Sequence, residues 1–224
     1  YRIDAINNNC YYHVFNRGMA KQPVFGDEAD YYRFVYCLYK LNNRGGAIRT
    51  RNDRFGSNLP KQDRIVEILK WSLLPNHYHI LLCEVFDGAV VEFAKRLGNA
   101  YTKYFNTRYT KSGYLFQGKA KTVEIENEAQ FMYIPQYVDL NPLDLKFPLW
   151  KKGGGVNGKK AVRFLKEYRW SSFRDYMGES NFPDVINRSL YFELFGTDER
   201  SYEDDLESWI DEGNPMSTWH VDMG

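Results

Sequence analysis

The sequence predicts an α+β fold of the ferredoxin-like type: a split β-α-β antiparallel sheet with both helices on one face. Three observations lead to this class. Segments with strand and helix character alternate in the order strand, helix, strand, strand, helix, strand. A Pro-Asn pair separates the two middle strands. At 224 residues the chain is long enough for one such domain with additions. A tyrosine-bearing helix and a C-terminal extension are expected to follow.

The first half of the pattern is a strand, a helix and a polar loop. Residues 10–16 mix aromatic and branched side chains, which favours a strand, and His13 within it is expected to have no chemical role. Residues 27–41 carry apolar side chains at helical spacing, with Asp27 available as the N-cap. Residues 42–62 are polar and rich in Arg, Asn and Gly, so a loop is expected.

The second half repeats the pattern with a tight turn inside it. Residues 63–74 are expected to form a strand that turns at Pro75-Asn76 into the next strand, residues 77–85. Apolar side chains at helical spacing predict a helix over residues 90–105. The fourth strand is centred on residues 121–125.

The remaining segments predict a third helix and an extension. Asn127 is a good N-cap for a helix that Pro135 is expected to kink. Residues 151–160 resemble a phosphate loop, but position 160 is Lys where Ser or Thr would bind Mg²⁺, so a flexible basic loop is expected instead. Residues 198–213 are acidic with apolar side chains at helical spacing, which predicts an amphipathic helix docked on the domain.

Composition and charge narrow the classes of function. Three cysteines without a CxxC pair fit reduced thiols and a cytoplasmic protein, and no apolar run reaches membrane-spanning length. The net charge of +1 conceals an uneven distribution: residues 89–121 hold seven basic side chains and one acid, whereas residues 198–212 hold eight acids and one arginine. A basic middle is expected where a protein meets nucleic acid, and a solvated helix face is the alternative.

Two of the four histidines lie one residue apart in an apolar run. Strand side chains alternate between faces, so His77 and His79 should point the same way and form half of a metal site; two polar residues on the wetter face of a strand are the alternative. On the third helix, Tyr133, Tyr137 and Asn141 fall four residues apart and share a face. An asparagine oxygen can complete a His-His site for a divalent ion, most comfortably Mg²⁺ or Mn²⁺, with Zn²⁺ or Co²⁺ as alternatives. A combined metal and nucleophile site is therefore expected.

Five segments, in one consistent order, resemble a known family. They are YHVFNRG at 12–18, WSLLPNHYHILL at 71–82, GYLFQGKAKTV at 113–123, YVDLNPL at 137–143 and YRWSSFRDYMG at 168–178. Together they resemble the REP-associated tyrosine transposases, which are relatives of the single-tyrosine HUH insertion-sequence transposases. The match covers roughly residues 10–180, more than a single short motif would.

The resemblance implies roles for individual residues. In this family a His-hydrophobic-His pair binds a divalent metal, and the tyrosine that opens a Tyr-x-x-x-Asn-Pro motif is the nucleophile. These roles fall on His77, His79 and Tyr137, and Asn141 is implied as the third ligand. The chain departs from the family at Asp139, where a histidine or a neutral residue is more usual, and a change in the local metal electrostatics is expected there.

The expected partner is single-stranded or hairpin DNA, and the oligomeric state is left open between monomer and homodimer. The side chains expected to contact DNA are Arg17, Lys95, Lys103, Arg108, Gln117, Lys119 and Lys121. The expected domains are a catalytic domain over residues 1–150, a basic loop and aromatic segment packing back on it over residues 151–180, and an acidic extension over residues 181–224.

Three functions are consistent with this sequence. The first is a metal-dependent transesterase that cuts and rejoins single-stranded DNA through a 5′-phosphotyrosine. The second is a domesticated protein that binds DNA hairpins and no longer cuts. The third is a metal-dependent phosphodiester hydrolase in which Tyr137 only packs. The resemblance favours the first.

Overall fold

The computed structural model describes residues 10–48, 62–152 and 155–212. Its centre is an antiparallel sheet of four strands in the order β2-β3-β1-β4. The strands are β1 (Tyr11–Arg17), β2 (Val66–Leu74), β3 (His77–Glu84) and β4 (Lys121–Glu124). This topology confirms the predicted α+β class, and the strands and helices follow one another along the chain in the predicted order. Most of the loop expected over residues 42–62 lies outside the described residues.

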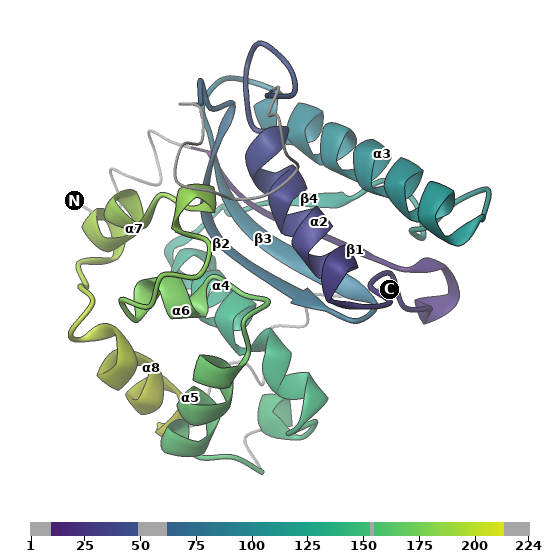
Figure 1. Ribbon diagram of the computed structural model, residues 1–224. Coiled ribbons are helices and arrows are strands. Elements are labelled where there is room, and N and C mark those ends of the chain that lie inside the picture. Colours follow the sequence, from purple (N-terminus) through teal and green to yellow (C-terminus); the bar gives the residue numbers. More distant parts are fainter. Residues whose placement is uncertain (1–9, 49–61, 153–154, 213–224) are drawn as a thin grey trace.

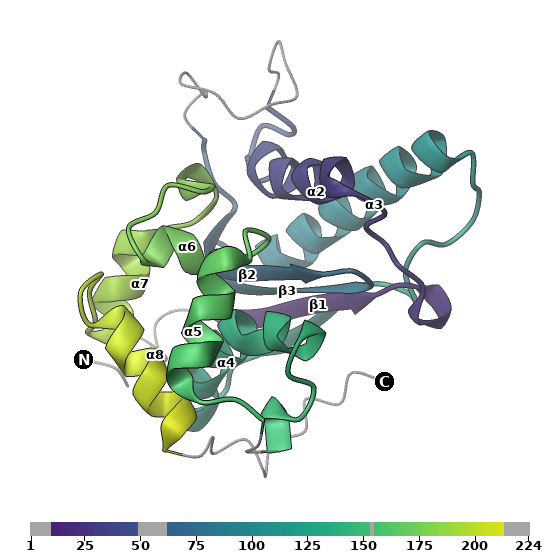
Figure 2. The same cartoon turned by 60° about the horizontal axis from the view of Figure 1, so that its bottom comes forward.

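Helices cover both faces of the sheet. Helices α2 (Glu28–Lys40) and α3 (Ala89–Tyr109) lie on one face, as predicted, whereas α4 (Glu128–Leu140) and α5 (Gly158–Glu167) lie on the other (Figure 2). The predicted caps of two helices are present. The carboxylate of Asp27 accepts hydrogen bonds at the start of α2, and the side chain of Asn127 does so at the start of α4.

Three helix details differ from the sequence-based expectation or refine it. Helix α3 continues beyond residue 105 to Tyr109, and α4 is a single helix that contains Pro135. Helix α5 begins at Gly158, inside the stretch expected to be a loop. The side chain of Asn157 accepts a hydrogen bond from the backbone N–H of Lys160, and this N-cap starts the helix.

The chain beyond α5 packs against the edge of β2 and on the face of the sheet that α4 covers. It forms α6 (Phe173–Tyr176), α7 (Arg188–Phe195) and α8 (Tyr202–Asp211), which gather on one side of the molecule (Figure 1). The backbone N–H of Leu73 donates to the carbonyl of Trp170, and that of Ser172 donates to the carbonyl of Trp71, both at 2.9 Å. The aromatic segment 168–172 therefore extends the pairing beyond β2.

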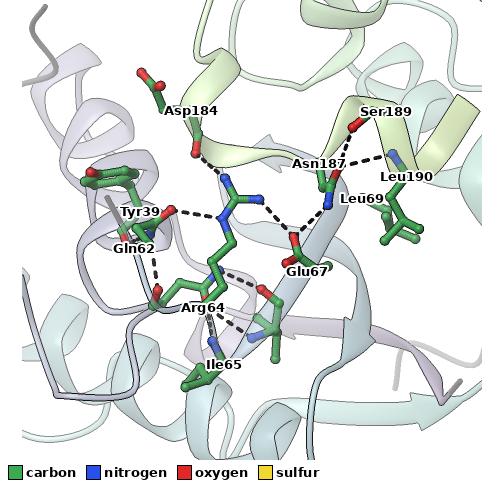
Figure 3. Close-up of polar contacts among 12 residues, drawn as sticks. Tyr39, Gln62, Arg64, Ile65, Glu67, Leu69, Asp184, Asn187, Ser189 and Leu190 are labelled. Atoms are coloured by element: carbon green, nitrogen blue, oxygen red, sulfur yellow. Dashed lines mark hydrogen bonds and ion pairs between the residues drawn. The ribbon is translucent and has the colours of Figure 1, made fainter. Parts of the chain in front are cut away.

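Arg64 links the start of β2 to the C-terminal part of the chain (Figure 3). Its guanidinium donates to the carbonyl of Asp184 at 3.0 Å and to the carboxylate of Glu67 at 2.9 Å. The side-chain amide of Asn187 donates to the same carboxylate at 3.1 Å, and its backbone N–H donates to the carbonyl of Ile68 at 2.8 Å. These contacts fix the segment before α7 against the sheet.

The described part of the chain contains no helix that is both long and apolar enough to cross a membrane. All three cysteines are free thiols.

The two faces of β3 pack against different helices, and the candidate site lies on the face that packs against α4. The ring of Tyr78 packs on Phe34 of α2, with centroids 4.8 Å apart. The ring of His79 lies edge-on to Tyr137 of α4, with centroids 5.3 Å apart. The rings of His77 and His79 are neighbours at 5.2 Å. The alternation predicted from the sequence is therefore present, and both histidines face α4.

Candidate functional site

The site lies between β3 and the C-terminal end of α4. Asn141 is the C-cap of that helix and opens the 3-10 turn Asn141–Leu145. Its side-chain oxygen Oδ1 lies 3.4 Å from Nε2 of His77. Tyr137, one helical turn earlier, lies against the ring of His79. The structure thus brings together the four residues that the sequence singled out on two separate elements.

Hydrogen bonds fix which nitrogen of His77 carries its proton. The amide nitrogen of Asn76 donates to the carbonyl of Lys21 at 3.1 Å, so its oxygen faces Nδ1 of His77 at 2.6 Å. Nδ1 must then be the donor, and Nε2 presents a lone pair towards Asn141. The amide nitrogen of Asn141 is directed to the carbonyl of Tyr137, at 3.4 Å. Two electron-pair donors, Nε2 and Oδ1, therefore face one another.

One ring nitrogen of His79 has a hydrogen-bond partner, and the other has none among the described residues. Its Nδ1 lies 2.9 Å from Nε2 of His13 on β1, and the two rings are stacked. Its Nε2 is buried and has no hydrogen-bond partner among the described residues. Contrary to the expectation from sequence, His13 is therefore in direct contact with the site. The strand register explains why: His13 pairs with Leu81, which puts it diagonally across from His79.

Burial keeps these imidazoles neutral. Desolvation lowers the pKa of His13 to about 3 and that of His79 well below its usual value. Desolvation, with a contribution from the charge of Arg17, lowers the pKa of His77 to about 4. A neutral imidazole is the form that binds metal ions, so these histidines remain in the ligand form throughout the neutral pH range.

Tyr137 is enclosed and has cationic neighbours. Only 4% of its surface is exposed, and this burial raises its pKa. A hydrogen bond with the Asn141 side chain and the charge of Arg17 act in the opposite direction and lower it. The ammonium group of Lys151 lies 5.4 Å from the centroid of the Tyr137 ring and is bound to the carboxylate of Asp144 at 2.6 Å. The phenol thus lies beside an ion pair, and the negative charge of Asp144 raises its pKa while the charge of Arg17 lowers it.

The donor set fits a divalent cation. The lone pair of His77 and the oxygen of Asn141 face each other, and the buried Nε2 of His79 lacks a partner. A cation bound by these three atoms would satisfy all of them. Within residues 10–48, 62–152 and 155–212, no three or more His, Cys, Asp or Glu side chains are placed to hold a metal ion. A metal site here therefore depends on the neutral oxygen of Asn141.

Tyr133 shares the helix face of Tyr137 but has a different setting. The two rings are stacked with centroids 5.8 Å apart, and Tyr133 also lies 6.3 Å from the ring of Trp209 on α8. Its buried hydroxyl makes no hydrogen bond within the described chain. Tyr133 thus lies on the α8 side of Tyr137, away from the histidines.

The residues expected to contact DNA fall into two groups. Lys95, Lys103 and Arg108 belong to α3, which covers the face of the sheet opposite to Tyr137. Arg108 is also bound to the carboxylates of Asp27 and Asp30. The other group surrounds the end of β1 and the edge strand β4, on the side of the site. It consists of Arg17, Gln117, Lys119 and Lys121.

The remaining outcomes concern Asp139 and two residues that the sequence did not single out. Asp139 is fully buried and forms an ion pair with Lys70, so it is not directed at the histidines. The expectation that it changes the metal electrostatics has no contact to support it. His13 carried one signal, its place in a matched segment, whereas Lys151 was noted only as the first residue of the basic stretch 151–160.

Comparisons with known proteins find similarity at the level of structure only. No family model matches the chain, and no curated protein does. Among solved structures, the chain is similar to the REP-associated tyrosine transposase bound to a REP hairpin. The match has 14% sequence identity and a TM-score of 0.43, and it covers 80% of this chain and 85% of the other. A likeness of this degree carries no information about chemistry, which depends on the residues of the site.

Proposed function

We propose that this protein is a DNA strand transferase that cuts and rejoins single-stranded or hairpin DNA through a covalent bond to Tyr137. The observation that carries the proposal is the placement of Tyr137 and Asn141, one helical turn apart, directly over His77 and His79. A nucleophile and a set of three metal-ligand atoms thereby serve the same small volume. The five segments that resemble the REP-associated tyrosine transposases support the same reaction.

In the proposed reaction the phenol oxygen of Tyr137 attacks a backbone phosphorus atom. The new oxygen-phosphorus bond forms while the bond from phosphorus to the 3′ oxygen breaks, and the 3′ oxygen takes up a proton as the phenol loses one. The products are a 5′-phosphotyrosine and a free 3′-hydroxyl, and the reverse reaction rejoins the strand without external energy. A bound divalent ion would polarise a phosphoryl oxygen. Burial and the charge of Asp144 raise the pKa of the phenol, and Asn141 and Arg17 lower it and so oppose this shift.

The exposed edge beside the site has the chemistry for a nucleic-acid contact. Lys121 is exposed at the start of the edge strand β4, and Lys119 is exposed in the segment just before it, where both can reach phosphates. The ring of Tyr114, in the preceding loop, is 84% exposed and can stack on an unpaired base. These features support single-stranded or hairpin DNA as the partner.

One observation favours a second candidate, a hairpin-binding protein that does not cut. Tyr137 is almost fully enclosed, with Lys151 beside its ring. A nucleophile must reach the phosphorus atom, so cleavage requires the turn Trp150–Lys152 to move or a phosphate to enter beside Lys151. If neither happens, the edge around β4 still binds DNA while the tyrosine remains inert.

The experiment is incubation of the purified protein with end-labelled single-stranded and hairpin DNA in Mg²⁺ or Mn²⁺, followed by denaturing electrophoresis. The proposed function gives a protein-DNA adduct that survives denaturation and is removed by protease. Intact DNA combined with a shift on a native gel supports the second candidate. Free cleaved DNA without an adduct indicates a hydrolase and contradicts the role of Tyr137.

A further inference from the structure

The contact between His13 and His79 is the most specific polar interaction around the proposed metal site. Nε2 of His13 and Nδ1 of His79 are 2.9 Å apart, and the ring centroids are 5.0 Å apart with an interplanar angle of 19°. Exposure is 1% for His13 and 0% for His79. Water therefore does not compete for this hydrogen bond. The outer nitrogens of the pair, Nδ1 of His13 and Nε2 of His79, are both buried without a partner among the described residues, so either direction leaves one N–H unpaired until a ligand binds.

A neutral imidazole carries one N–H, so the bridge has two directions. If His13 donates, the proton of His79 sits on Nε2 and that atom offers no lone pair. If His79 donates from Nδ1, its Nε2 is a free lone pair on the other side of the ring. Only the second arrangement makes His79 a metal ligand.

The neighbouring histidine shows the second arrangement already in place. Asn76 accepts the Nδ1 proton of His77, and this leaves the Nε2 of His77 directed at Asn141. Both histidines of β3 thus have Nδ1 turned to a partner and Nε2 left for the site. Histidine ligands of metals generally have such a partner, which fixes the ring orientation and the tautomer.

We propose that His13 is a positioning residue that accepts the Nδ1 proton of His79, so that the lone pair on Nε2 of His79 is held in the site. The inference rests on the proposed function for the purpose of that lone pair, although the tautomer itself is a property of the protein without metal. His13 acts on the metal site through His79, and its ring also packs edge-on against the ring of Tyr137, with centroids 5.8 Å apart.

The first test is the tautomer of His79 in the metal-free, full-length protein labelled with ¹⁵N-histidine. Long-range proton-nitrogen NMR spectra distinguish the two tautomers, and the chain has only four histidines to assign. We expect the proton of His79 on Nδ1 in the wild-type protein. A proton on Nε2 would overturn the inference, and this result needs neither metal nor a variant.

The second test compares two substitutions by calorimetric titration with Mn²⁺ alone. His13→Gln keeps an oxygen that can accept the proton, whereas His13→Leu has a similar size and no acceptor. We expect Mn²⁺ affinity to fall by about 10- to 100-fold in His13→Leu and to stay near wild type in His13→Gln. Equal affinities in all three proteins would contradict the inference. Thermal unfolding of both variants checks that they are folded.

Failure of the proposed function has a different signature. A wild-type protein that binds no Mn²⁺ contradicts the metal site, and the His79 tautomer then decides the role of His13 by itself. Conversely, Mn²⁺ binding by a protein whose His79 carries its proton on Nε2 retains the metal site and removes His13 from it.

Discussion

The Nζ atom of Lys70 lies 2.5 Å from Oδ2 of Asp139, and neither side chain is exposed to solvent. The ammonium group is surrounded by three tyrosine rings, those of Tyr176, Tyr191 and Tyr202, with centroids at 4.2, 4.2 and 4.3 Å. Burial lowers the pKa of Lys70 to about 8 and raises that of Asp139, while their mutual attraction opposes both shifts. The pair joins β2 to α4 two residues from Tyr137 and two from Asn141.

Removing only one partner of this ion pair should strongly destabilise the fold. Lys70→Met keeps most of the side-chain volume but leaves the carboxylate of Asp139 buried without its cation. We expect the free energy of unfolding, measured by urea denaturation, to fall by about 3–5 kcal/mol. Adding Asp139→Asn removes the second charge, so the double variant should recover part of this loss. A Lys70→Met protein as stable as wild type would show that the pair contributes nothing.

The buried histidines predict an acid-sensitive fold. The folded pKa values of His13 and His77, about 3 and about 4, lie below the unfolded value of 6.5. The unfolded state therefore binds more protons, and the stabilisation present above pH 6.5 is lost as pH falls towards those folded values. Each histidine should lower the unfolding free energy by about 1.4 kcal/mol per pH unit below 6.5.

Asp175 has the opposite effect on the pH dependence of the unfolding free energy over part of this pH range. Burial raises its folded pKa from 3.8 to about 6, so its contribution to stability increases as pH falls from 6 to 3.8. The expected net result is still a loss of stability between pH 6.5 and 5, measured by urea denaturation at several pH values. In His13→Leu the unfolding free energy should change less steeply with pH, because one proton fewer is taken up on unfolding. Identical slopes for the two proteins would mean that His13 is not neutral in the fold.

Local patterns predicted the fold well because they report short-range physics. Strand alternation placed His77 and His79 on one face, and helical spacing placed Tyr137 and Asn141 together. The contact of His13 depends instead on the register between two strands that are far apart in sequence, which no local pattern determines.

Lys70 illustrates a second limit of the sequence. A lysine in a strand is expected at the surface, because its charge is costly to bury. Its partners come from α4 and from α6, α7 and α8, much later in the chain. Only the assembled tertiary structure supplies the carboxylate and the aromatic rings that make its burial tolerable.

The two groups of basic residues should respond differently to salt. Lys121 is exposed at the edge strand beside the site, so Lys121→Gln should lower the salt slope of hairpin-DNA binding by about 0.7 to 0.9. Arg108→Gln is the matched control, because Arg108 is already bound to Asp27 and Asp30. Its salt slope should stay at the wild-type value. Fluorescence anisotropy over a range of salt concentrations measures both, and the reverse ranking would place the DNA on the α3 face.

The nucleophile is expected to be Tyr137 and not Tyr133. Sequence spacing alone puts both on one face of α4, but only Tyr137 lies against His79 and has Asn141 one turn ahead. Tyr137→Phe removes one oxygen and almost no volume. It should leave folding and DNA binding near wild type and reduce adduct formation by at least about 10³-fold, because no other group in the site can replace the phenol.

Tyr133→Phe is the matched control for that experiment, since it removes the same oxygen one turn away. The hydroxyl of Tyr133 has no hydrogen-bond partner among the described residues, so removing it should leave both stability and adduct formation close to wild type. Denaturing electrophoresis gives the amount of adduct, and mass spectrometry of the digested adduct locates the nucleotide. A nucleotide attached to Tyr133 would show that the attacking oxygen lies on the α8 side of the helix, and an active Tyr137→Phe protein would show that Tyr137 is not the nucleophile.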